Sequence, residues 1–444
     1  MEYSMSFYNA ILNSVILPLG DLSTGGSYIR NLNQWRAYDS YSDRDLRRVQ
    51  KDNLKSILKY ASKHVPYYQK INYRKDLSSE GNLKRFPILT KDILRNQVDS
   101  LISNHHKKSS LDINHSSGST GVQSFTYMTM KHKFYLRALQ THWWMWSGYH
   151  IGDKVLQFGI SQKRGVLKNL KDLFYRSYYH KAFGISEKEF ADLARKVKEK
   201  SIGFIAGYPS VINQLALVSE PNTKIEGIIC FGDKLFNQHR INIRHAFGEY
   251  VRVLDTYGCA EGLLMACRKD LDYYYIMSPH VYLEIVDDDG QPVPDGEMGN
   301  ILVTCLTNKA MPLIRYRLGD LGIMLPEELY PEQRELEYPL LQKIVGRETD
   351  VIKTESGKIL NVHSFTGVFE YFQEIKQFKI IQRDLKSIKV EYIVDDTITD
   401  ERLKELEKKF LNLTDSDLTI TFVKVSRISA TKSGKPQIID ATLE

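Results

Sequence analysis

The sequence predicts a multidomain protein of mixed α/β and α+β class. Its 444 residues correspond to about three average domains, or to two of unequal size. Between about 150 and 260, short apolar runs alternate with amphipathic helical patterns, which is typical of a layered sheet with parallel strands. Strands and turns then dominate residues 281–325, and a charged segment with its own strand and helix signals follows Gly346. We therefore expect a large N-terminal part and a small C-terminal α+β domain.

The composition is that of an ordinary globular protein and excludes disordered, collagen-like and coiled-coil classes, because 42% of the residues are hydrophobic and 26% are charged. The formal net charge is +7, but clusters of Lys and Arg such as 44–48 and 196–200 are interrupted by acidic residues. This pattern favours solvated helix surfaces over a nucleic-acid interface. The 4 cysteines show no C-x-x-C or zinc-finger spacing, so we expect a reduced, cytoplasmic protein.

The first hundred residues read mainly as helix. Residues 3–20 carry no charge, but Ser and Asn dilute the apolar residues and Pro18 interrupts them, so we expect a packed N-terminal helix and no transmembrane span. No basic segment precedes this stretch, which argues against a cleavable signal peptide. Attachment to a membrane surface stays open as an alternative. An amphipathic helix follows over residues 46–61 and ends before Pro66, and Thr90 is placed to cap a further helix.

The remaining elements follow from apolar runs and helical periodicity. Strands are expected at 155–158, 203–206, 227–231, 251–254, 281–286, 299–306, 388–394 and 418–425. Helices are expected at 187–200, 210–218, 237–247 and 400–411.

A polar run at residues 116–121 is the most conspicuous local feature. It reads Ser-Ser-Gly-Ser-Thr-Gly, and small residues of this kind allow backbone N–H groups to approach an anion while the hydroxyls add donors. No Walker frame fits the run. Taken alone, it is a linker about as often as a phosphate site.

Residues 255–262 follow the expected strand at 251–254, and the C-terminal end of a strand is a common place for a ligand in open α/β sheets. Tyr257 offers a ring for stacking on a base, and Glu261 offers carboxylate oxygens for Mg²⁺. The alternative is a turn whose tyrosine packs in the core. Three later runs, at 312–320, 346–353 and 433–436, combine Gly with Asp, Arg or Lys that could bind hydroxyls or phosphate. Each of these three is also a common surface turn.

Taken in order, these segments resemble the adenylate-forming (acyl-CoA synthetase) superfamily. The similarity is to its phenylacetate–coenzyme A ligase branch, which includes relatives encoded with capsular-polysaccharide genes. The match extends from about residue 55 to residue 440. The residues that carry it are 58–61, 65–68, 86–91, 116–121, 207–210, 294–299 and 312–320.

The resemblance implies a large N-terminal domain of α/β layers plus a distorted β-barrel, and a small mobile C-terminal lid. The expected boundaries are 1–346 and 347–444. Within the first domain we expect a helical lead-in over 1–110, an α/β sheet over 111–262 and a β-rich subdomain over 263–346. The implied reaction is that a small carboxylic acid attacks ATP to give acyl-AMP, after which an acceptor, most often coenzyme A, displaces AMP.

The resemblance also implies roles for individual residues. Mg²⁺ would be held by Glu261, and Tyr257 with its neighbour Gly258 would bind adenine. The ribose hydroxyls would be bound by Asp320, with Arg347 close by at the start of the hinge. Lys435, on the C-terminal lid, would be the catalytic lysine that bridges carboxylate and phosphate oxygens. The ATP phosphates would be cradled by Ser116, Ser117, Gly118, Ser119, Thr120 and Gly121.

The sequence departs from the family pattern at several positions. Ala260 stands where a hydroxyl residue commonly precedes the metal-binding Glu, and residues 122–124 lack the usual basic residue. The hinge Asp falls on Thr349 or Asp350. Part of a zinc site of some relatives would fall on Cys267 and His280, but the later cysteine pair is replaced around residues 339–343, so we expect no structural zinc and an ordinary buried thiol at Cys267.

The sequence leaves the acid, the acceptor and the oligomeric state open, a homodimer included. Trp143, Trp144, Trp146 and Tyr208 could line an apolar acyl pocket or pack a helix onto the sheet. Transfer to an amine, a hydroxyl or a carrier thiol in capsule or O-antigen synthesis is the alternative to coenzyme A. A non-catalytic nucleotide- or acyl-binding protein is the alternative of another class, and the loss of the hydroxyl at position 260 favours it.

Overall fold

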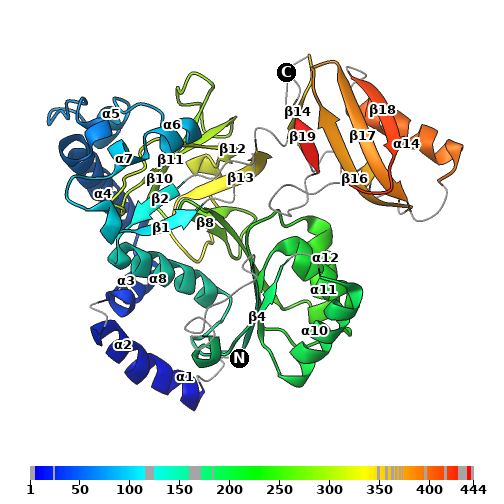
Figure 1. The fold of residues 1–444 in the computed structure, drawn as a ribbon, viewed down its shortest axis with the longest axis horizontal. Helices are drawn as coiled ribbons and strands as arrows, with labels where there is room; N and C mark the ends of the chain where they lie inside the picture. The colour runs from blue at the N-terminus through cyan, green and yellow to red at the C-terminus, as the bar shows by residue number, and fades with distance from the viewer. Residues whose placement is uncertain are drawn as a thin grey trace.

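The structure is a computed structural model of the 444-residue chain. It describes residues 6–23, 26–115, 125–159, 172–182, 185–347, 351–355, 359–361, 365, 368–369, 372, 374–394, 398–414, 418–428 and 438–441. Figure 1 shows a larger body built from the N-terminal elements and a smaller one that contains β16–β19 and α14.

The chain begins with helices. The first elements are α1 (Phe7–Ile11), the π-helical turn η1 (Leu12–Ile16), α2 (Leu17–Ser23), α3 (Tyr28–Tyr38), α4 (Asp43–His64) and the 3-10 turn η2 (Pro66–Tyr68). Next come α5 (Ser79–Leu83), α6 (Lys91–Asn96), α7 (Val98–Leu101) and the 3-10 turn η3 (Lys108–Ser110). No helix among the described residues is both long and apolar enough to cross a membrane.

Helix α4 forms where the periodicity predicts it. Ser42 caps its N-terminus by accepting a hydrogen bond from the backbone of Asp45, and the helix ends just before the predicted stop at Pro66. The buried side chains recur at three- to four-residue spacing, so they form one face against the core. Thr90 caps α6 in the same way as Ser42, by accepting from the backbone of Ile93, and this confirms the predicted helix start.

The central feature is an 11-stranded sheet, in the order β10-β11-β12-β13-β9-β8-β7-β6-β5-β3-β4. Its parallel part comprises β3 (Val155–Gly159), β4 (Ser177–Lys181), β5 (Phe204–Gly207), β6 (Gly227–Cys230) and β7 (Arg252–Cys259). The helices of this part are α8 (Met130–Trp146), α10 (Glu187–Glu199), α11 (Pro209–Val218) and α12 (Asn237–Phe247). The strands and helices predicted between 155 and 254 are thereby confirmed, within one or two residues at most ends.

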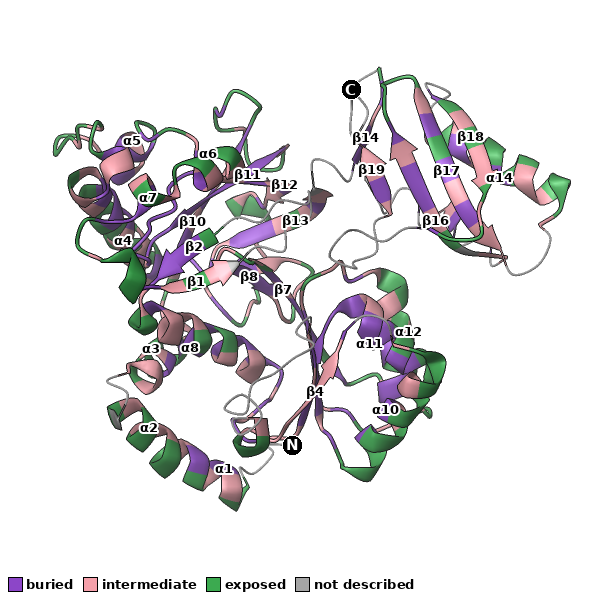
Figure 2. Cartoon of the chain, viewed as in Figure 1, coloured by how far each residue is buried: buried purple, intermediate pink, exposed green. Residues whose placement is uncertain are grey.

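Helices cover both faces of the parallel strands because successive strand residues point to opposite sides. Ile228 on β6 packs in a core cluster with α10, α11 and α12, whereas its neighbour Ile229 packs with α8 and α3. Figure 1 shows α10–α12 grouped on one side of these strands. The inner strands β5 and β6 are buried along their whole length, whereas β4 at the edge of the sheet is only partly buried (Figure 2). This is the layered α/β arrangement that the apolar runs predict.

The sheet continues without interruption into antiparallel strands. These are β8 (Leu263–Arg268), β9 (Tyr274–Ile276), β10 (Val281–Val286), β11 (Met298–Cys305), β12 (Tyr316–Met324) and β13 (Leu340–Arg347), with the 3-10 turn η4 (Glu327–Leu329). A separate hairpin precedes α8 and is made of β1 (Asp112–His115) and β2 (Phe125–Met128). The distorted barrel and the subdivision at residue 262 stay predictions.

The C-terminal elements have a core of their own. They are β14 (Val351–Lys353), β15 (Ile359–Asn361), β16 (Ile375–Gln382), β17 (Ser387–Val394), α14 (Asp400–Leu413), β18 (Thr419–Lys424) and β19 (Ile439–Ala441). Leu406 and Phe410 on α14 pack with Val390 on β17, and every buried residue of this cluster lies between 352 and 439. The predicted fold class, a large α/β part with a small α+β domain at the C-terminus, is confirmed.

Candidate active site

The end of β7 and the turn into β8 carry three of the predicted site residues. The sequence analysis placed Tyr257 and Gly258 after the strand, and this placement was wrong: β7 extends through Cys259 because its second half pairs with β8. Glu261 therefore occupies a tight turn between two hydrogen-bonded strands. Gly262 has a φ of +87°, and a Cβ on it would lie 2.9 Å from the Asn114 Nδ2 atom, so the turn requires glycine.

Two hydrogen bonds join this segment to β12. The Tyr257 hydroxyl donates to the Asp320 Oδ2 atom at 2.8 Å. Four residues further along β7 and its turn, Glu261 Oε1 accepts at 2.9 Å from the hydroxyl of Tyr316, which lies four residues before Asp320. In one hydrogen bond the tyrosine comes from β7 and the carboxylate from β12, and in the other the tyrosine comes from β12 and the carboxylate from the turn after β7. Together the two hydrogen bonds hold Asp320 and Glu261 in a fixed relative position.

A bulge in β12 accounts for how Asp320 comes to point at this site. Arg317 on β12 pairs with Leu302 on β11, and Leu321 pairs with Asn300. Between these two pairs β12 therefore contains three residues, whereas β11 contains one. The extra residues include Gly319, whose φ of +81° is in the left-handed region. Bulges re-aim the side chains that follow them, and here the result is that Asp320 faces the Tyr257 hydroxyl.

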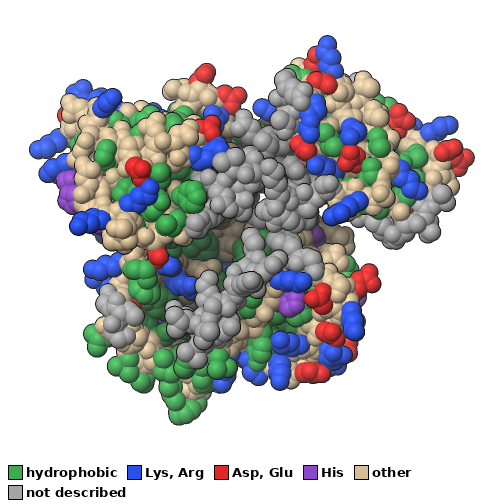
Figure 3. Space-filling view, viewed as in Figure 1, with side chains coloured by type: hydrophobic (Ala, Val, Ile, Leu, Met, Phe, Trp, Pro, Cys, Tyr) green, Lys and Arg blue, Asp and Glu red, His purple; other side chains and the backbone are tan. Residues whose placement is uncertain are grey.

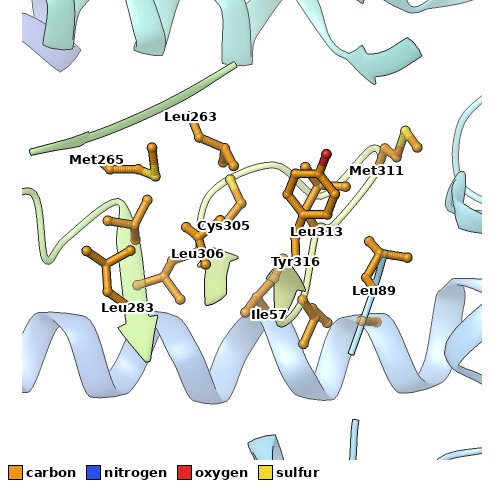
Figure 4. Packing of buried hydrophobic residues seen from close by; sticks show 14 of the residues in the cluster. Ile57, Leu89, Leu263, Met265, Leu283, Cys305, Leu306, Met311, Leu313 and Tyr316 are labelled. Carbon is orange, nitrogen blue, oxygen red and sulfur yellow. The ribbon is translucent and has the colours of Figure 1, made fainter. Parts of the chain in front are cut away.

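Tyr316 is completely buried within the core cluster that covers α4. Figure 4 shows its ring beside Leu313, with the hydroxyl oxygen directed away from the helix. Burial, reinforced by the nearby charge of Glu261, raises the pKa of Tyr316 above its ordinary value. The phenol therefore stays protonated and donates one hydrogen bond to Glu261. That bond engages the Oε1 atom of Glu261 and orients the carboxylate, whose oxygens are hard ligands of the kind Mg²⁺ prefers.

Cys259 lies in the same segment, and burial together with the Glu261 carboxylate raises the pKa of its thiol well above the ordinary range. A thiol held neutral in this way is a poor nucleophile. The site therefore provides oxygen ligands and hydrogen-bonding groups but no activated thiol.

The β1–β2 hairpin is tied to the same turn. The Thr126 hydroxyl on β2 donates to the backbone carbonyl of Glu261 at 3.0 Å, and the Asn114 amide on β1 lies against Gly262. The two strands flank the Ser-Gly run, whose predicted phosphate-binding residues lie outside the described residues. The strands on either side of that run are thus anchored beside Glu261.

Arg347, predicted to lie near the ribose at the start of the hinge, ends β13, and its backbone pairs with Asp320. Its side chain lies outside the described residues, as do Thr349, Asp350 and the predicted catalytic Lys435. The structure thus brings together Tyr257, Glu261, Asp320 and the backbone of Arg347, which are distributed over some 90 positions of the sequence.

Sequence reasoning missed two residues of this arrangement, Tyr316 and Thr126. Tyr316 lies within the run 312–320 that the sequence analysis singled out, but no role was assigned to it. The available signal was the equal four-residue spacing of Tyr257 to Glu261 and of Tyr316 to Asp320. That spacing cannot by itself show which tyrosine serves which carboxylate.

The tryptophans of α8 act in packing. The Trp146 indole donates to the Asp39 carboxylate at 3.0 Å, and the Trp143 indole donates to the Met277 Sδ atom at 3.1 Å. Both side chains are buried in the cluster that joins α8 to the sheet. These contacts favour the packing alternative for Trp143 and Trp146 over an acyl pocket.

The two residues considered for a zinc site are both buried. The His280 Nδ1 atom is 2.8 Å from the Thr307 hydroxyl, and Cys267 is a free thiol. Across the described part of the chain, no group of three or more His, Cys, Asp and Glu side chains is arranged to hold a metal ion.

Comparison with known proteins gives two family matches on different parts of the chain. Residues 182–305 match the AMP-binding enzyme family, and residues 351–441 match the CapK C-terminal domain. Among curated proteins, the chain is 26% identical over 379 residues to the phenylacetate–coenzyme A ligase of Escherichia coli, covering 78% of this chain and 82% of the relative. It is 24% identical over 415 residues to the protein CapK of Staphylococcus aureus, covering 88% of each.

Together these matches fit the adenylate-forming ligases. They also fit the phenylacetate–coenzyme A ligase branch, because one relative is such a ligase and the CapK matches cover the same chain. The fold agrees as well: a 2-hydroxyisobutyryl-CoA ligase structure superposes with a TM-score of 0.71 at 17% identity, over 92% of this chain and 91% of that one. Of the residues gathered at the site, Asp320 lies in one of the segments that carry the resemblance, the run 312–320.

Proposed function

We propose that this adenylate-forming ligase activates a small carboxylic acid with ATP and passes the acyl group to coenzyme A. In the first step a carboxylate oxygen attacks the α-phosphorus of ATP, the bond to the β-phosphate breaks, and pyrophosphate leaves. In the second step the acceptor thiolate attacks the acyl carbonyl and AMP leaves. The observation that carries the proposal is the pair of hydrogen bonds from Tyr257 to Asp320 and from Tyr316 to Glu261.

Each site residue would bind a different part of the nucleotide or its metal ion. Asp320 presents a carboxylate that can accept from both ribose hydroxyls. Tyr257 beside it would contact adenine, while most of its side chain packs in the core cluster with 9% exposed. Glu261 would hold Mg²⁺, and a bound Mg²⁺ would neutralise charge on the phosphates. The carboxylate oxygens of Glu261 and the orientation set by Tyr316 fit that ion. The backbone amides of residues 116–121 would bind phosphate oxygens, and Lys435 would neutralise charge that develops during adenylation.

Nucleotidyl transfer depends on positioning and charge neutralisation more than on covalent help from the protein. The described site fits this requirement, because it holds two fixed carboxylates and buried donors but no activated nucleophile. We infer that residues 347–444 act as a lid that carries Lys435 to the site for adenylation and withdraws it afterwards. We further infer a cytoplasmic location, in keeping with the 4 cysteines, all free thiols.

A second acceptor class is supported by one specific observation. The similarity to CapK extends over 88% of the chain, and the C-terminal residues 351–441 match the CapK C-terminal domain. These two CapK matches support an amine, a hydroxyl or a carrier thiol used in polysaccharide biosynthesis as the alternative acceptor to coenzyme A.

Carboxylate-dependent exchange of labelled pyrophosphate into ATP tests the first step without assuming the acceptor. A panel of aromatic, short-chain, amino and sugar acids should contain at least one that supports Mg²⁺-dependent exchange. The active acid is then incubated with coenzyme A, amines and sugars to identify the acceptor. If no acid in a broad panel supports exchange, the protein is a non-catalytic nucleotide- or acyl-binding homologue.

A further inference from the structure

The helical segment formed by α1, η1 and α2 exposes its apolar side chains instead of burying them. Phe7 is 83% exposed, Leu19 is 60% exposed and Leu22 is 80% exposed. Of the large apolar residues in this segment, only Leu12 is buried. The exposed apolar side chains of the segment, here called the N-terminal apolar face, are Phe7, Ile11, Val15, Ile16, Leu19 and Leu22.

The opposite side of the same segment attaches to the protein through polar groups and through Leu12, Leu17 and Tyr8, which pack with the core cluster of α3 and α8. Asn9 is buried, and its side-chain amide donates to the Asp153 carboxylate at 2.5 Å. The Asn13 amide donates to the carbonyl of Asn9 at 2.6 Å and to the carbonyl of Ile151 at 3.3 Å. A surface helix normally buries its apolar face and exposes its polar one. Here a second set of apolar side chains stays exposed beyond those that pack on the core, so this apolar face is available to a partner outside the molecule.

The N-terminal apolar face continues onto a neighbouring segment. The Tyr8 hydroxyl donates to the carbonyl of Phe174 at 2.6 Å, and Phe174 and Leu173 are 46% and 74% exposed. Figure 3 shows hydrophobic side chains gathered at the lower edge of the molecule, where α1 and α2 lie in Figure 1. A contiguous exposed patch of this kind marks an interaction site.

Arginines lie near the face. The Arg176 guanidinium lies 3.8 Å from the centre of the Tyr8 ring. On α3, which follows α2 directly, Arg30 and Arg36 are exposed. The nearby carboxylates are Asp21, which accepts from two backbone amides at the start of α3, Asp153, which accepts from Asn9, and Asp172, which precedes Leu173. The whole chain carries a formal net charge of +7.

We propose that the N-terminal apolar face inserts into the surface of an anionic lipid bilayer, with the flanking arginines at the headgroups. Residues 7–23 form a helical run of about 25 Å, attached along one side to the protein, so it can lie in the interface but not span it. The centres of protein–protein interfaces are enriched in Tyr, Trp and Arg. This face instead consists of five aliphatic residues and one phenylalanine, which suits acyl chains better than a second copy of the chain. The proposal is independent of the adenylation chemistry.

Co-sedimentation of the full-length protein with vesicles tests this proposal. We expect binding to phosphatidylcholine vesicles that contain phosphatidylglycerol and much weaker binding to phosphatidylcholine alone, because the arginines contribute only on an anionic surface. The triple variant Phe7→Ser/Leu19→Ser/Leu22→Ser should lower the vesicle association constant by roughly two orders of magnitude. Its melting temperature and pyrophosphate-exchange activity should stay close to wild type, since the three side chains are exposed and lie outside the active site.

A matched control uses three exposed apolar residues elsewhere, in the variant Leu217→Ser/Ile241→Ser/Tyr250→Ser. This control should bind vesicles as wild type does. The proposal is overturned if the wild type ignores anionic vesicles, if it binds both vesicle types equally, or if the control loses as much binding as the N-terminal variant. It is also overturned if sedimentation without lipid shows a dimer that the N-terminal variant abolishes, because a second copy then covers the face.

Discussion

Replacing Tyr316 by Phe tests whether the orientation of Glu261 matters for adenylation. The substitution removes one buried hydroxyl that donates to the Glu261 carboxylate at 2.9 Å and leaves the ring that fills the core. A hydrogen bond to a charged group is worth about 1.5–3 kcal/mol. If that energy is used to hold Glu261 in the geometry that binds Mg²⁺, its loss should reduce kcat/KM for pyrophosphate exchange by about 10- to 150-fold at low Mg²⁺.

The assay is pyrophosphate exchange measured over a range of Mg²⁺ concentrations. Tyr316 is a positioning residue in this interpretation, so the Mg²⁺ concentration for half-maximal activity should rise and excess Mg²⁺ should restore part of the rate. The matched control is Tyr338→Phe, which removes another fully buried hydroxyl that donates to a carboxylate, that of Asp39 at 3.2 Å. The control should lower stability without moving the Mg²⁺ dependence. The reasoning is refuted if Tyr316→Phe changes the rate less than about threefold, or if both variants shift the Mg²⁺ dependence alike.

Three further predictions follow from the structure and the family assignment. Gly262→Ala places a side chain in a left-handed turn beside Asn114, which costs about 1–2 kcal/mol. The rate of pyrophosphate exchange should fall at least about tenfold, while the melting temperature falls by only a few degrees. An unchanged exchange rate would show that the turn tolerates a side chain. Burial lowers the pKa of His132 to about 4 and the pKa of His280 well below its usual range. Near pH 6.5 these two histidines therefore bind protons in the unfolded chain but not in the native state. The free energy of unfolding should fall as the pH drops from 7 to 5, by up to about 1.4 kcal/mol per pH unit for each histidine. Urea unfolding at several pH values measures this, and an equally steep dependence in His132→Gln/His280→Gln would contradict it. Lys435→Ala should abolish pyrophosphate exchange while thioester formation from supplied acyl-AMP largely persists; equal loss of both steps would exclude the assigned role.

Much of the fold could be predicted because its signals are local. The apolar stripe of α4, its end before Pro66 and the cap at Thr90 each depend on residues within a few positions of one another. The parallel strands were recognisable because strands covered on both faces read as short continuous apolar runs. The full length of β7 was not predictable in this way, since residues 255–259 extend only by pairing with β8.

In the candidate site, too, some residues could be predicted from local sequence and others could not. Tyr257, Glu261 and Asp320 could be singled out because they stand in motifs whose residue types suit nucleotide and metal binding. The role of Tyr316 could not, because a buried tyrosine looks the same in sequence whether its hydroxyl meets a carbonyl, a carboxylate or solvent. The N-terminal segment shows the same limit: its uncharged composition predicts a packed helix, but the structure turns most of its apolar side chains outward.

By itself, the sequence determined the secondary structure of most segments, the α/β and α+β class and the resemblance to the adenylate-forming ligases, since these depend on residue type and spacing along the chain. The tertiary structure alone decided which hydroxyl holds which carboxylate, which face of the N-terminal helices remains uncovered and where β7 ends. Those outcomes depend on contacts between residues far apart in sequence, such as the 63 positions between Tyr257 and Asp320. Only the folded backbone, with its bulge at Gly319 and its turn at Gly262, sets the distances on which those contacts depend.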